Sequence, residues 1–210
     1  LEFRHVLTLA LNLALDRILP RDTLEPLSGR HLQMRVLGVD EFAEQLPLLR
    51  QWRQKAIEHL KERGETVAVA ESLTAGGVGH ALTTIPGASS IFLGGVISYT
   101  SDVKVNFLGV SQKTIDQYSV VSEEVANEMA AGALAKFEST WAIATTGIAG
   151  PGDYMGIREG TVWIAIKGPI SQTLHLQLDS GREGVRTGAI SSAIGNFARI
   201  LSSREKGSSQ

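Results

Sequence analysis

A serine and a lysine stand in surroundings that could support nucleophilic chemistry. Ser72 lies in the segment AESLTAGG (70–77), where an apolar run ends and small residues follow. Lys104 lies in the apolar segment VKVNF, and partial burial there would lower the pKa of its amine and make it available as a base. A serine hydroxyl becomes a nucleophile when a base takes its proton. If Ser72 is a nucleophile, Lys104 is a better candidate base than any of the five scattered histidines.

These segments also have purely structural interpretations. Ser72 or Thr74 could be no more than the cap of the following helix, because Ser and Thr are preferred at that position. Lys104 could lie on the wet face of a short helix. A third segment, TTGIAGPGD (145–153), holds three glycines and a proline. It could expose backbone N–H groups to a phosphate, or it could form an ordinary turn. The residues alone leave these alternatives open.

Three predicted strands must position these segments. Residues 66–72 form a β-branched, nearly continuous apolar run that is typical of a buried strand, and 90–100 and 140–147 predict two more. Ligands bind at the carboxyl ends of strands in open α/β sheets, so the three segments are expected to form one site. A helix is predicted over 74–85. Its N-terminus should offer free N–H groups to a phosphate or an oxyanion.

The rest of the pattern completes an α/β fold. Short helices are predicted over 101–110 and from the N-cap Ser122, where two glutamates occupy the first turn. Residues 160–168 and 171–179 predict an antiparallel pair, and the last helix is predicted over 182–201. Strands that alternate with helices, together with one hairpin, indicate a mixed sheet with helices on both faces.

Residues 1–63 differ from the rest and predict a mainly helical N-terminal extension before a domain at 64–203. Helices are expected at 4–19 and 41–63, with a short strand within 29–39. Residues 4–40 faintly resemble the start of sterol-carrier-like domains, which would imply a lipid-handling role. The other interpretation is a helical extension that packs on the domain or on its dimer mate. Residues 204–210 predict a disordered tail.

Composition excludes several classes of protein. The 210 residues are 43% hydrophobic and 20% charged, which is normal for a soluble globular protein. Without cysteine there is no disulfide, no Cys-ligated zinc and no cysteine nucleophile, and no histidine motif predicts a metal site. A net charge of -2 disfavours nucleic-acid binding. The apolar stretch Val6–Leu15 is well short of the ~20 residues that span a membrane, so no membrane partner is expected.

Several motifs together, in their order along the chain, resemble the CinA C-terminal family, which includes the nicotinamide mononucleotide amidohydrolases. The motifs are AESLTAGG, PGASS, GGVISYT, VKVNFLGV, VSEEVANEMA, TGIAGPG, GTVWIAI and SGREGVR. They extend over most of residues 64–203, and their joint order and spacing carry the resemblance. It implies a three-layer α/β/α sandwich with a mixed, mostly parallel sheet, a cytoplasmic homodimer, a small-molecule nucleotide substrate, and no metal or organic cofactor.

The resemblance also implies a reaction in pyridine nucleotide salvage. The carboxamide of nicotinamide mononucleotide would be hydrolysed to nicotinic acid mononucleotide and ammonia. Ser72 would attack the amide carbonyl, Lys104 would accept its proton, Tyr99 would orient the lysine or the substrate, and N–H groups after Ser72 would stabilise the oxyanion. The implied substrate-binding residues are Glu71, Thr74, Gly76, Thr146, Gly147, Ala149, Gly150 and Arg182.

The sequence departs from the family pattern at a few positions. Ala75 replaces the first glycine of a usual Gly-Gly pair, and alanine disfavours a positive φ if that glycine needs one. The segment GDYMGIREG (152–160) lacks the Lys-Pro that is common in this loop, and Gly181 stands where aspartate is common. These departures favour an alternative function: a catalytically degenerate, nucleotide-binding module of the same family.

Overall fold

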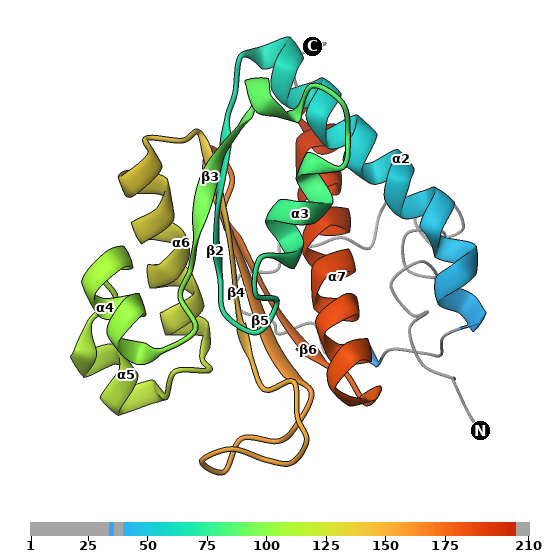
Figure 1. Cartoon of the computed structure of the whole chain (residues 1–210). Coiled ribbons are helices and arrows are strands. Elements are labelled where there is room, and N and C mark those ends of the chain that lie inside the picture. The colour runs from blue at the N-terminus through green and yellow to red at the C-terminus, as the bar shows by residue number, and fades with distance from the viewer. Residues whose placement is uncertain (1–33, 36–39, 205–210) are drawn as a thin grey trace, which may run out of the picture.

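The computed structural model describes residues 34–35 and 40–204. Within this part of the chain, a six-stranded mixed sheet lies between two layers of helices (Figure 1). The strands, in chain order, are β1 (Met34–Arg35), β2 (Val67–Glu71), β3 (Phe92–Ile97), β4 (Trp141–Gly147), β5 (Thr161–Lys167) and β6 (Gln172–Gln177). Their order across the sheet is β1-β6-β5-β4-β2-β3.

The helices divide between the two faces of the sheet. One face carries α4 (Ser101–Leu108), α5 (Gln112–Tyr118) and α6 (Glu123–Phe137); the other carries α2 (Asp40–Arg63), α3 (Gly77–Thr83) and α7 (Gly181–Ser203) (Figure 1). A 3₁₀ turn, η2 (Ala88–Ser90), precedes β3. The predicted three-layer α/β/α arrangement is therefore confirmed.

The sheet combines parallel and antiparallel pairs. Strand β2 runs parallel to both β3 and β4, and β1 runs parallel to β6. The pairs β4–β5 and β5–β6 are antiparallel, so the predicted hairpin between the last two strands is confirmed. Helix α5 is not among the predicted elements. In its sequence, QKTIDQY, the one buried side chain is that of Ile115. The segment therefore lacks the repeated apolar residues at helical spacing from which a helix could be predicted.

Strand β2, which lies between β4 and the edge strand β3, explains why two cores form. All five of its residues are buried, and neighbouring side chains point to opposite faces. Val67 and Val69 join the larger core, toward α3 and α7, whereas Ala70 joins the smaller core toward α6. Burial on both faces is why this strand appears in the sequence as a continuous apolar run.

Two helices show how the sequence positions these layers. Ser122 caps α6 as predicted, since its hydroxyl accepts a hydrogen bond from the N–H of Val125 at 3.2 Å. In α2, Ala56, Ile57 and Leu60 are buried in the larger core. The second half of α2 therefore packs as part of the same hydrophobic core, while a domain boundary at residue 64 stays a prediction.

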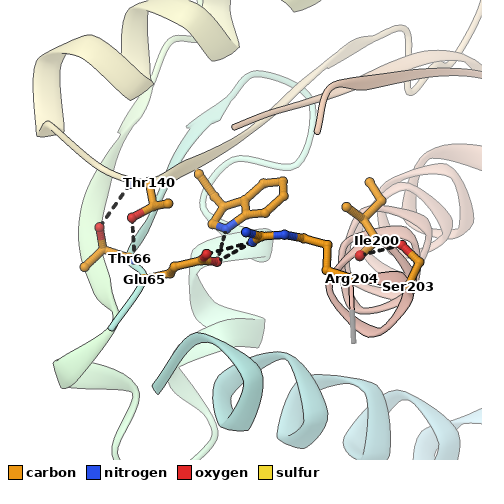
Figure 2. Close-up of polar contacts among 7 residues, drawn as sticks. Glu65, Thr66, Thr140, Ile200, Ser203 and Arg204 are labelled. Carbon is orange, nitrogen blue, oxygen red and sulfur yellow. Dashed lines mark hydrogen bonds and ion pairs between the residues drawn. The ribbon is translucent and has the colours of Figure 1, made fainter. Parts of the chain in front are cut away.

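A polar cluster fastens the edge of the sheet where β2 and β4 begin (Figure 2). The Glu65 carboxylate accepts hydrogen bonds from Arg204 Nη1, at 2.7 and 2.8 Å, and from Trp141 Nε1 at 2.7 Å. Beside it, Thr66 and Thr140 exchange two bonds of 3.1 Å between backbone N–H and hydroxyl. The cluster ties the end of α7 to two strands.

Some predictions fall partly or wholly outside the described residues. The helix over 4–19 lies wholly outside the described residues. The segment 4–40 with the resemblance to sterol-carrier-like domains lies outside them except for the short strand β1 and residue 40, and β1 falls within the strand expected over 29–39. The tail is predicted from residue 204, but the structure instead anchors Arg204 through the ion pair with Glu65. Within the described part of the chain, no helix is long and apolar enough to cross a bilayer.

We expect Glu65→Gln to lower the free energy of unfolding by about 2 kcal/mol, because Arg204 and the Trp141 indole lose the carboxylate that both contact. Urea unfolding followed by far-UV circular dichroism measures this change. Glu62→Gln is the control, since the Glu62 side chain is 70% exposed and its substitution should change stability by less than ~0.5 kcal/mol. Equal effects of the two substitutions would contradict a stabilising role of the cluster.

Candidate active site

The segments that follow β2, β3 and β4 line one cavity. They meet at the carboxyl ends of these strands, at the lower edge of the sheet in Figure 1. The cavity has a volume of about 570 Å³. Six of the residues that line it are Ser72, Tyr99, Lys104, Thr146, Gly147 and Arg182. The expectation that the three segments form one site, which rests on the position of ligands in open α/β sheets, agrees with this geometry.

Ser72 and Lys104 are in direct contact inside this cavity. Lys104 Nζ lies 3.1 Å from Ser72 Oγ and also donates a hydrogen bond of 2.7 Å to the carbonyl oxygen of Ser98. Lys104 is 2% exposed and Ser72 8%. On α4, Lys104 lies one turn from buried Leu108, so it belongs to the inward face of that helix. The alternative that places this lysine on a wet helix face is therefore wrong.

Burial changes the acid–base properties of Lys104. Loss of hydration lowers the pKa of its amine to about 8. No carboxylate among the described residues forms an ion pair with it, and the bonds to Ser72 and to the Ser98 carbonyl replace only part of the hydration that the ammonium form loses. With a pKa near 8, roughly a tenth of the amine is neutral at pH 7, compared with less than a thousandth for an ordinary lysine. The amine can therefore take a proton from Ser72 near neutral pH.

Glu71 occupies the helix terminus that was expected to be open to a ligand. Its carboxylate accepts hydrogen bonds from the backbone N–H groups of Gly76, Val78 and Gly79, at 2.9, 3.0 and 2.8 Å. It is 1% exposed and does not line the cavity. A carboxylate at this terminus satisfies N–H groups that have no partner within the helix. The prediction that the N-terminus of α3 binds phosphate or oxyanion is wrong, and Glu71 has a structural role here.

Thr74 and Gly76 also lie outside the cavity lining. The hydroxyl groups of Thr74 and Thr145 are 2.7 Å apart, and both side chains are fully buried. Gly76 has φ +94° and precedes α3, so it provides the turn that leads into the helix. The structure therefore places both residues in the frame of the Ser72 turn, and neither meets a ligand in the cavity. It also shows that Ser72 is not a helix cap, because α3 begins at Gly77.

The end of β4 and the segment after it form a wall of the cavity, with Thr146, Gly147, Ala149 and Gly150 all among the lining residues. The Thr146 hydroxyl donates to the carbonyl oxygen of Val120 at 2.7 Å. At position 147, a Cβ atom would lie 2.6 Å from a backbone oxygen of β5, so only glycine fits. Close packing of β4 on β5 thus keeps this wall in place.

Tyr99 does not hydrogen-bond to Lys104, and its expected role toward the substrate stays a prediction. Its hydroxyl accepts a hydrogen bond of 3.1 Å from Arg182 Nη2, and Arg182 Nη1 donates to the carbonyl oxygen of Gly150 at 2.7 Å. Arg182 thereby links the β3 and β4 loops across the cavity rim. Among the described residues, the groups that hold Lys104 Nζ are Ser72 and the Ser98 carbonyl, so Tyr99 does not orient the lysine.

The family model described as "CinA C-terminal domain" matches residues 49–201, well over half of the chain. The chain belongs to the CinA C-terminal domain family. The match includes the second half of α2, which packs in the same core as the strands.

Relatives of this CinA C-terminal domain include longer proteins. A CinA-like protein of Synechocystis is 44% identical over 151 residues, which is 69% of this chain and 36% of the relative. A putative competence-damage inducible protein of Limosilactobacillus reuteri is 44% identical over 135 residues, 62% of this chain and 32% of the relative. The chain thus spans about a third of these curated relatives.

Solved structures match at nearly their full length. The competence/damage inducible protein CihA of Agrobacterium tumefaciens is 33% identical, with a TM-score of 0.68 over 73% of this chain and 95% of that one. A CinA superfamily protein of Klebsiella pneumoniae is 28% identical, with a TM-score of 0.71 over 74% and 98%. These structures resemble the described domain in fold and share part of its sequence.

Two departures from the CinA pattern have visible consequences. Ala75 adopts φ +51°, the left-handed conformation in which glycine is favoured, so the alanine strains the turn after Ser72. In the β4–β5 loop, the Glu159 carboxylate accepts the N–H of Gly152 at 2.6 Å, and Asp153 accepts the N–H of Glu159 at 2.8 Å. The Gly152 N–H is therefore not free for a phosphate, contrary to the expectation for this loop.

Proposed function

We propose that this domain hydrolyses the carboxamide of nicotinamide mononucleotide, giving nicotinic acid mononucleotide and ammonia in pyridine nucleotide salvage. The observation that carries the proposal is the 3.1 Å contact between Ser72 Oγ and the buried amine of Lys104. Membership of the CinA C-terminal domain family supports it, because the motifs that resemble the amidohydrolases include both residues. The cavity beside this pair is large enough for a ligand of nucleotide size.

The first half of the reaction forms an acyl-enzyme. Neutral Lys104 accepts the proton of the Ser72 hydroxyl as Oγ attacks the carboxamide carbon. The tetrahedral intermediate then collapses, the C–N bond breaks, and the Lys104 ammonium returns its proton to the departing amine, which leaves as ammonia. The bond of 2.7 Å to the Ser98 carbonyl holds the amine in place while it changes charge.

The second half returns the enzyme to its starting state. Lys104, neutral again, takes a proton from a water molecule as the water oxygen attacks the ester carbon. Collapse of the second intermediate breaks the bond to Ser72 Oγ, which regains its proton from Lys104. The product leaves as a carboxylate, and the proton released on its ionisation passes to solvent. Every atom added to the substrate comes from one water molecule.

Backbone groups beside the nucleophile complete the chemistry. The N–H of Ser72 donates to the carbonyl oxygen of Thr145 within the sheet, so it is engaged. The N–H groups of Leu73 and Thr74 donate to no acceptor among the described residues, which leaves them available to the oxyanion. One such donor typically contributes ~3 kcal/mol to transition-state stabilisation. At the rim, the cationic Arg182 attracts the substrate phosphate.

We expect Ser72→Ala to reduce ammonia release from nicotinamide mononucleotide roughly a thousandfold or more, because no other hydroxyl lies against Lys104 Nζ in the described part of the chain. A coupled ammonia assay on the purified protein measures the rate. Ser90→Ala is the matched control, since Ser90 is exposed on η2 and remote from the cavity. Equal rates in wild type and Ser72→Ala would refute the assignment of the nucleophile.

A second experiment separates hydrolysis of the nucleotide from binding without turnover. The strained Ala75 and the altered 152–159 loop favour the alternative of a nucleotide-binding module without turnover. A thermal shift with nicotinamide mononucleotide, followed by recovery of unchanged nucleotide after long incubation, would support that alternative and contradict the amidase.

We expect kcat/KM to rise about tenfold between pH 6 and pH 7 and to level off above a pKa of about 8. The sign follows from the role of Lys104 as a base, because the neutral amine is the active form and is lost as pH falls through its pKa. Initial rates at fixed ionic strength, with circular dichroism to verify folding at each pH, measure the profile. A rate that does not change between pH 6 and pH 9 would rule out this lysine as the general base.

A further inference from the structure

Arg186, on α7, donates hydrogen bonds to the turn that follows Ser72. Its Nε donates to the carbonyl oxygen of Leu73 at 3.2 Å, and its Nη2 makes a longer contact of 3.4 Å with the carbonyl oxygen of Thr74. Its Nη1 pairs with Glu183 at 3.0 Å. All three nitrogens of the guanidinium are thus engaged, and two of them bind consecutive carbonyl groups of one turn. Arg186 does not line the cavity, so it contacts the site only through this turn.

The carbonyl contacts determine where the N–H groups of the turn point. A trans peptide group is planar, and its N–H and C=O point in opposite directions. The Leu73 carbonyl faces Arg186, so the N–H of Thr74, in the same peptide group, faces away from it. The Ser72 carbonyl accepts a bond from the N–H of Ala75 at 3.1 Å, which likewise turns the N–H of Leu73 outward from the turn.

The turn needs such support because it is strained. Ala75 has φ +51°, a conformation that side chains other than glycine rarely adopt, and it closes the bond to the Ser72 carbonyl. Strain at this point favours rotation of the adjacent peptide groups. A rotated peptide would move its N–H away from the position that the oxyanion of Ser72 chemistry occupies.

We propose that Arg186 is a positioning residue for the oxyanion-binding donors: it orients the Thr74 N–H through the Leu73 carbonyl and, through the Thr74 carbonyl, the Ala75 N–H whose bond to the Ser72 carbonyl turns the Leu73 N–H outward. This inference rests on the proposed function, since it assigns the oxyanion site of the same hydrolase. The guanidinium suits this role because its planar fork reaches two carbonyl groups and Glu183 at once, which a lysine amine cannot do.

The first test compares steady-state constants on nicotinamide mononucleotide. We expect Arg186→Met to lower kcat roughly a hundredfold with KM changed less than about threefold, because oxyanion donors act on the transition state. Arg186→Lys should recover less than a tenth of the lost rate, whereas added guanidinium ion should partly rescue Arg186→Ala. Arg199→Met, on the same helix and bonded to Asn196, is the matched control and should keep the wild-type kcat.

A second readout does not depend on the identity of the substrate. With a small fluorophosphonate, Ser72 Oγ attacks phosphorus, fluoride leaves, the proton passes to Lys104, and the phosphoryl oxygen takes the place of the oxyanion. We expect the rate of fluoride release in Arg186→Met to fall in parallel with kcat. Intact-protein mass spectrometry detects the mass added by the label. The absence of this added mass in Ser72→Ala verifies that Ser72 is the labelled residue.

The outcomes distinguish the two proposals. Wild-type labelling without hydrolysis of nicotinamide mononucleotide would refute the substrate, while the labelling rates of the Arg186 variants would still test the positioning role. Neither labelling nor turnover in wild type would overturn the hydrolase and this inference with it. An Arg186→Met protein with wild-type kcat and labelling rate, or one whose loss matches its unfolded fraction, would overturn the positioning role alone.

Discussion

Burial of the Lys104 amine beside Ser72, with no carboxylate paired to it in the part of the chain that the structure describes, is the interaction on which the rest of the site depends. A charged ammonium in this position loses hydration that its two hydrogen bonds replace only in part, so its pKa falls to about 8. A neutral amine can accept a proton, and the hydroxyl that could give one is 3.1 Å away. The burial that lowers the stability of the folded protein therefore also makes the Ser72–Lys104 pair reactive.

The fold holds this pair through residues that do not line the cavity. Strand β2 delivers Ser72 between two parallel neighbours, and the end of β3 provides the Ser98 carbonyl that fixes Lys104. Glu71 holds the start of α3, and Arg186 holds the turn from the side of α7. At the opposite edge of the sheet, the Glu65 cluster fastens the end of the same helix. Rigid elements on both faces thus support a strained and dehydrated site.

Sequence patterns predict the parts of this protein that depend on local chemistry. The apolar run before Ser72, the cap Ser122 and the hairpin of β5 and β6 all follow from residue types and spacing. Placing the reactive segments at strand ends was enough to expect one site. The hydrogen bonds from the N-terminus of α3 to the Glu71 carboxylate were not predictable. The sequence of a helix start is the same whether a ligand or a side chain accepts its free N–H groups. The Ser98 carbonyl was equally hidden, since every residue has a backbone carbonyl.

The protonation state of one amine decides whether the site can work in this way. NMR titration of protein labelled with ¹³C and ¹⁵N at lysine, with Lys104→Met to assign the signal, measures the pKa of Lys104 directly. The loss of hydration on burial predicts a midpoint of about 8 for the pKa of Lys104, separate from the exposed lysines. A Lys104 signal that titrates together with the exposed lysines, near their ordinary pKa of ~10.4, would show a hydrated ammonium and contradict the proposed base.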